Sequence, residues 1–268
     1  MRTLCETFRY QAFWTWQQLC LAHENEVHIG EESFTDFNLL EIRSRHTDQV
    51  ITKTFTKFQE AEVGADWEWW LTGKSRKWIG FRLQAKVINH KSARFEHLNY
   101  SNEPVRKQDD YFDYLEDSPR SQADKLCRHA LKNRCIPLYC LYTYSPEALP
   151  NSRHAPEAYG CSLVDAHFVR QHQKDPEFRR LRNLFHQMLP WHCLVCHSRD
   201  DQDLPHRAHE VWRTSILQPH TALDFQSAPA ESPPHYVQLL MQGDLQHGPD
   251  ECLRTITVFS DTNEIGWT

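Results

Sequence analysis

The chain has 268 residues, with 12% aromatic residues and only eight glycines, which indicates an ordered globular protein with a sizeable core. Its formal net charge of −6 argues against a polyanionic partner for the chain as a whole. No stretch approaches the roughly 20 apolar residues of a membrane span, and the first 25 residues lack the apolar core of a secretory signal. We therefore expect the nine cysteines to be reduced thiols of a cytoplasmic protein.

The first half of the chain predicts two helices, three strands, a third helix and a fourth strand, in that order. Apolar spacing predicts helices over 2–23 and 31–45, and β-rich runs predict strands over 50–58, 66–71 and 78–89. A polar stretch over 90–120 follows, then a helix over 122–134 with a clear apolar stripe and a buried strand over 136–144. This order predicts an α/β fold with a mixed central sheet flanked by helices.

The second half is less regular. It contains a proline-marked loop over 146–156, a helix near 175–188, a Cys/His-rich stretch over 191–209 and an exposed connection over 218–234. Two short apolar runs, 236–241 and 253–259, have strand character. We expect a core over 1–150 and a C-terminal extension over 151–268, whose role the sequence leaves unassigned.

One carboxylate and one Gln-x-Lys tripeptide lie on two consecutive predicted strands. Asp66 begins the strand over 66–71, and Gln84-Ala85-Lys86 lies within the strand over 78–89. Because side chains alternate along a strand, Gln84 and Lys86 share one face, and a hairpin would bring Asp66 close to them. Carboxylate and amide oxygens suit Mg²⁺, with the Ala85 carbonyl as a third ligand, and an ammonium can stabilise negative charge developing on a phosphate.

This pattern resembles the PD-(D/E)xK, or restriction-endonuclease-like, nuclease superfamily, and the Q-x-K form resembles its Mrr-like branch. The segments Gly64–Trp70 and Ile136–Tyr142 are also similar to an uncharacterised bacterial family of this type. The resemblance covers about residues 28–145 and implies a restriction-endonuclease-like core that hydrolyses nucleic acid with Mg²⁺. It implies metal binding by Asp66 and Gln84 and transition-state stabilisation by Lys86. Gln84 replaces the Glu that is commoner at this position in the superfamily, which removes a negative charge from the site and favours a single Mg²⁺.

Further residues could complete such a site. The resemblance implies a glutamate on the first core helix. The candidates are Glu31, Glu32 and Glu41, of which Glu32 is our choice, and Glu60 and Glu62 remain open.

Residues 71–107 carry nine basic residues against two acidic ones, a net charge of +7, which suits a polyanion. We expect nucleic-acid contacts from this block and from the start of the helix over 122–134: Lys74, Arg76, Lys77, Arg82, Gln122 and Lys125. The alternative is an ordinary solvated surface.

Four residues of the Cys/His stretch have spacing that could bind zinc. Cys193, Cys196, His206 and His209 form a C-x2-C-x9-H-x2-H pattern, and thiolate and imidazole suit tetrahedral Zn²⁺. Buried free thiols are the alternative.

The sequence thus favours a metal-dependent nuclease, with DNA preferred over RNA and a role in defence or mobile-element biology by analogy. Two alternatives remain: a catalytically inactive nucleic-acid-binding module with the same scaffold, and a zinc-binding structural or interaction protein. The oligomeric state is open.

Overall fold

The computed structural model describes residues 2–55, 67–98, 121–147, 149, 152–172, 174–196, 202–216, 228–250 and 253–262. Their strands form one seven-stranded sheet in the order β1-β7-β2-β3-β4-β5-β6. Strands β2–β3, β4–β5, β5–β6 and β1–β7 pair antiparallel, whereas β3–β4 and β2–β7 pair parallel. The predicted α/β class with a mixed, helix-flanked sheet is confirmed.

The elements of the first half lie close to their predicted positions. They are α1 (Leu4–Glu24), α2 (Glu31–Arg45), β1 (Val50–Thr54), β2 (Trp67–Thr72), β3 (Trp78–Val87), α3 (Gln122–Lys132) and β4 (Cys135–Tyr142). Capping boxes mark two helix starts: Thr3 with Glu6 at α1, and Ser121 with Asp124 at α3. Local sequence signals are therefore sufficient to define these elements.

The C-terminal extension is built into the same sheet. It supplies β5 (Cys161–Asp165), β6 (Leu189–Pro190) and β7 (Thr255–Ser260). Strand β7 lies between β1 and β2, with Val50 opposite Phe259 and Trp67 opposite Thr255. Strand β1 thus joins the sheet through β7, so the sheet extends beyond residues 1–150.

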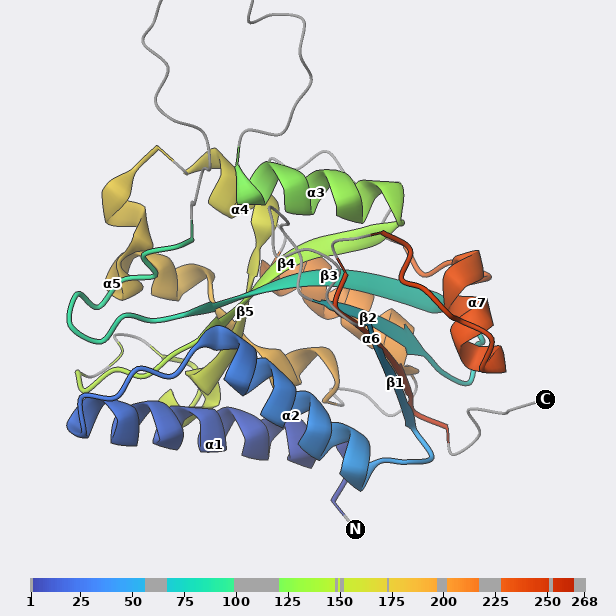
Figure 1. Cartoon of the computed structure of the whole chain (residues 1–268), viewed down its shortest axis with the longest axis horizontal. Helices are drawn as coiled ribbons and strands as arrows, with labels where there is room; N and C mark the ends of the chain where they lie inside the picture. The colour runs from blue at the N-terminus through green and yellow to red at the C-terminus, as the bar shows by residue number, and fades with distance from the viewer. Residues whose placement is uncertain are drawn as a thin grey trace, which may run out of the picture.

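Helices cover both faces of the sheet (Figure 1). On one face, α1, α2 and α6 (Leu204–Val211) pack over a core that contains Trp67, Trp69 and Phe81. On the other face, α3, α4 (Ala166–Gln171) and α5 (Leu181–Leu184) pack over β4 and β5, while α7 (His235–Gln242) packs over β2 and β7. Trp67, Trp69 and Trp70 are all buried between these helices and the sheet.

Two predicted elements of the second half are different in the structure. The run over 236–241, expected as a strand, is helix α7, preceded by Pro234 and ended by Gly243 with φ 79°. The helix expected over 175–188 is divided into η2 (Pro176–Arg179), α5 and η3 (Phe185–Gln187). The remaining short elements are η1 (Pro156–Gly160), η4 (Trp191–Leu194) and the π-helical turn η5 (Trp212–Ile216).

The cysteines correct another expectation. Cys5 on α1 and Cys196 after η4 form a disulfide, so the thiols are not all reduced in this structure. Six further cysteines in the described part of the chain are free. Within the same ranges, no helix combines the length and apolar character needed to cross a bilayer.

Candidate metal and phosphate site

Gln84 and Lys86 lie on the same face of β3, toward its C-terminal end. Both side chains are nearly buried, with exposed fractions of 3% and 4% for the two residues. Their neighbours on β4 are Tyr139 and Leu141, which pack beneath Ala123 and Leu126 of α3. The shared face predicted from strand alternation is therefore present.

A carboxylate from α2 reaches Lys86. Its Nζ lies 3.3 Å from Oε1 of Glu31, the first residue of α2, and the Glu31 side chain keeps 31% of its surface exposed. Glu32, the preferred candidate from the sequence, instead lies 3.5 Å from Arg254, and Glu41 pairs with Arg45. The glutamate next to Lys86 is therefore Glu31; Glu60 and Glu62 lie outside the described residues. We call Gln84, Lys86 and Glu31 the β3 cluster.

Asp66 also lies outside the described residues. Strand β2 begins at the next residue, Trp67, which pairs with Leu83, the residue before Gln84. The described part of the hairpin thus has the register that the Asp66 and Gln84 hypothesis requires.

The β3 cluster contains a polar atom that fits a metal ligand. Among the described residues, Gln84 Oε1 is buried and has no hydrogen-bond partner. Leaving a buried amide oxygen unpaired costs about 1–3 kcal/mol, so such an atom calls for an explanation. An amide oxygen with the Glu31 carboxylate nearby is an oxygen donor set suited to Mg²⁺, so the residues present fit the ion that the resemblance implies.

The start of α3 lies at the same end of the sheet. Because α3 returns from the end of β3 to the start of β4, its first residues are level with Gln84 and Lys86. Gln122 and Lys125 are both partly exposed there. Gln122 and Lys125 therefore lie at the same end of the sheet as the β3 cluster, and their contact with a substrate stays a prediction.

Arg82 does not face a substrate, contrary to the prediction. Its side chain is fully buried and donates two hydrogen bonds of 2.8 Å to Asp250 and one of 3.2 Å to Glu68. Glu68 also accepts from Trp70 Nε1 at 3.0 Å and from Tyr236 at 2.7 Å. Burial raises the pKa of Glu68, whereas these donors and the Arg82 charge oppose that rise. We call Arg82, Glu68 and Asp250 the Arg82 network, and it is an interior ion-pair cluster.

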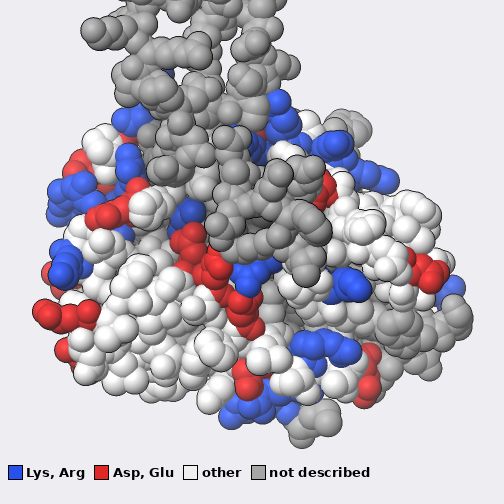
Figure 2. Space-filling model, viewed as in Figure 1, with Lys and Arg blue, Asp and Glu red and all other residues white. Residues whose placement is uncertain are grey.

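The basic turn between β2 and β3 is also far from the β3 cluster. Lys74 and Arg76 are exposed, and Lys77 pairs with Glu231. From Trp78 to Lys86 the strand rises roughly 26 Å at about 3.3 Å per residue. This part of the predicted basic block, Lys74, Arg76 and Lys77, therefore lies away from Gln84 and Lys86. Figure 2 shows acidic side chains in a band across the viewed face, with basic ones beside them.

The four predicted zinc ligands are not brought together. Cys196 is in the disulfide, and His206 Nδ1 lies 2.5 Å from Asp203 on the first turn of α6. Cys193 instead lies beside His192 and His154. The spacing of the Cys/His stretch could not predict His154, because His154 lies in the proline-marked loop, 38 residues before His192.

The surroundings set the protonation of these three groups. Burial, with Arg9 nearby, lowers the pKa of His192 to about 4 and also lowers that of His154. Burial raises the pKa of the Cys193 thiol to about 11, although the charge of Arg9 acts in the opposite direction. Both imidazoles are therefore neutral near pH 7.

No curated protein and no solved structure matches the chain. One family model matches residues 4–264, which is nearly the whole chain and includes both the β3 cluster and β7. The chain therefore belongs to the family described as "Family of unknown function (DUF6615)".

Proposed function

We propose that the protein is a Mg²⁺-dependent phosphodiesterase acting on nucleic acid, with DNA favoured over RNA. The observation that carries this proposal is the buried Gln84 Oε1, which has no hydrogen-bond partner in the part of the chain that the structure describes, beside the Lys86–Glu31 pair. The resemblance to PD-(D/E)xK nucleases supports it independently, because Glu31, Gln84 and Lys86 occupy a helix and a strand in that family's order. A role in defence or mobile-element biology, and a cytoplasmic location, belong to the same proposal.

Each residue has a distinct role in this proposal. Asp66 and Gln84 provide oxygen ligands, and Glu31 provides a third carboxylate or orients Lys86. Mg²⁺, when bound, neutralises phosphate charge and lowers the pKa of a water ligand. The Lys86 ammonium stabilises the charge that develops on the phosphate as the water attacks. Gln122 and Lys125 contact the nucleic-acid backbone.

The burial of Gln84 and Lys86 favours a second candidate, a binding module with the same scaffold that does not cut. With only 3% and 4% of these residues exposed, a phosphate cannot reach Lys86 unless neighbouring segments move. An assay that measures binding and cleavage separately distinguishes the two candidates.

The test uses supercoiled plasmid, linear DNA and RNA, each with Mg²⁺ or EDTA. We expect Mg²⁺-dependent cleavage that falls by about 100-fold or more in Lys86→Ala, the scale of losing one transition-state donor. Lys53→Ala is the matched control, because Lys53 is an exposed lysine on β1 of the same sheet. Binding without cleavage by the wild-type protein would support the module, and neither activity would remove both candidates.

A further inference from the structure

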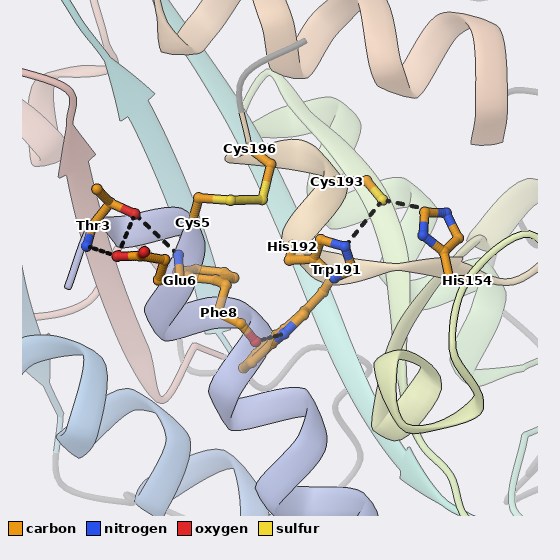
Figure 3. The surroundings of a disulfide bond; sticks show 9 residues. All are labelled: Thr3, Cys5, Glu6, Phe8, His154, Trp191, His192, Cys193 and Cys196. Carbon is orange, nitrogen blue, oxygen red and sulfur yellow. Dashed lines mark hydrogen bonds between the residues drawn. A yellow bond between two sulfur atoms is a disulfide. The ribbon is translucent and has the colours of Figure 1, made fainter.

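The start of α1 is linked to η4 and the residues just after it by a disulfide and a buried hydrogen bond. The disulfide links Cys5 to Cys196, and Trp191 Nε1 donates a buried 2.8 Å hydrogen bond to the Phe8 carbonyl. On the other side of η4, the side chains of His192 and Cys193 point toward His154 from the loop before η1 (Figure 3). We call His154, His192 and Cys193 the thiol–imidazole cluster.

The distances within this cluster match a shared metal ion. Cys193 Sγ lies 3.8 Å from His192 Nε2 and 3.9 Å from His154 Nε2. The three ligand atoms all lie within 4.8 Å of one another. Zinc bonds of about 2.3 Å to sulfur and 2.0–2.1 Å to nitrogen at a tetrahedral angle would place sulfur and nitrogen about 3.6 Å apart. Only small side-chain shifts therefore separate this arrangement from a coordination site.

The Cys193 thiol lies between the two imidazoles. Its sulfur can donate its proton to one Nε2 and accept from the other, and both Nε2 atoms lie at nearly equal distances from Sγ, so the three atoms converge on one point. A metal ion would occupy the point toward which all three atoms are directed. His192 is also 95% buried, with an unpartnered Nδ1 among the described residues, so its ring is held in place by packing.

We propose that His154, His192 and Cys193 bind one Zn²⁺, with the fourth position open to water or a small ligand. One thiolate and two imidazoles are a donor set that suits zinc and is unsuited to Mg²⁺. Arg9 and Arg153 lie near the cluster and oppose a dication, while the thiolate offsets one of its charges. The ion would link the loop before η1 to η4, next to the disulfide that ties η4 to α1.

This site keeps only Cys193 of the four ligands predicted from the sequence, and it does not depend on the phosphodiesterase proposal. The test uses untagged, full-length protein, with zinc content measured by elemental analysis after dialysis. Co²⁺ titration provides a second readout, because thiolate-to-Co²⁺ charge transfer and tetrahedral d–d bands report the donor set directly.

We expect one zinc per chain, and a loss of metal affinity of at least about 100-fold in Cys193→Ser or His154→Gln. Changing a residue that only hydrogen-bonds to a ligand costs about 10–100-fold. Cys20→Ser and His206→Gln are the matched controls and should keep full stoichiometry. Thermal unfolding in EDTA shows whether each variant still folds, so that a folding failure is not counted as loss of a ligand.

Two results would overturn the proposal. One is a wild-type protein that binds neither Zn²⁺ nor Co²⁺, with the disulfide intact or reduced. The other is metal binding that survives Cys193→Ser or that is lost in Cys196→Ser or His206→Gln, since the ligands would then be those that the sequence spacing predicted.

Discussion

Arg82 and Lys86 lie on the same face of β3 but differ in how their charges are paired. Arg82 is fully buried and is bonded to two carboxylates. One belongs to Glu68 on the neighbouring strand and the other to Asp250, which is 168 residues later in the sequence. Four residues along the strand, Lys86 lies 3.3 Å from the carboxylate of Glu31, which is partly exposed. Gln84 lies between them, and its Oε1 has no hydrogen-bond partner among the residues described here.

The contrast separates a structural role from a functional one. Removing one member of a paired buried network leaves uncompensated charge, so such residues are retained for stability. A buried oxygen without a partner lowers stability and is expected where a ligand supplies the missing contact. Arg82 Nε is also buried without a partner among the described residues, but the rest of the guanidinium bonds to two carboxylates. We therefore assign the Arg82 network to the stability of the sheet and propose that the β3 cluster is available for chemistry.

The largest expected effect is that of Arg82→Ala. Glu68 and Asp250 would remain largely buried without their cation, which should lower the free energy of unfolding by about 3–5 kcal/mol in urea titrations. Arg76→Ala, on the exposed turn, should change it by less than about 0.5 kcal/mol. A small effect of Arg82→Ala would contradict the assignment of the network to stability.

A medium effect is expected from Gly80→Ala, two residues before Arg82. A Cβ at this position would lie 2.5 Å from the ring of Trp70, which is itself 2% exposed and has little room to move. Overpacking of this kind costs about 1–3 kcal/mol, measurable by the same titration. Unchanged stability would show that this part of the sheet is looser than the packing indicates.

The smallest effect on stability is expected from Lys86→Met. The substitution keeps the length of the side chain and removes the charge, and Glu31 retains access to water. The free energy of unfolding should therefore change by less than about 1 kcal/mol, while cleavage is lost. If Lys86→Met lowered the free energy of unfolding as much as Arg82→Ala, Lys86 would have a structural role like that of Arg82.

Local patterns in the sequence were sufficient for the helices and strands of the first half. Local patterns do not indicate that β7 lies between β1 and β2, because Val50 pairs with Phe259 across more than 200 residues. The run 236–241 is too short for periodicity to distinguish strand from helix, and the flanking Pro234 and Gly243 were the better signals.

The site was predictable to the extent that it depends on local geometry. Strand alternation placed Gln84 and Lys86 on one face, but it also placed Arg82 there, and only the distant Asp250 distinguishes their roles. Glu31 and Glu32 are neighbours in the first turn of α2, so the packing of that helix decides which one meets Lys86. The cysteine pairing likewise depends on tertiary contacts.

The most direct test of the central claim is a crystal soaked in Mn²⁺, with anomalous scattering locating the ion. The account predicts a peak within oxygen-ligand distance, about 2.0–2.3 Å, of Gln84 Oε1 and an Asp66 carboxylate oxygen, with Lys86 alongside. An ion bound elsewhere, or no ion while Gln84 Oε1 is bonded to protein, would contradict it.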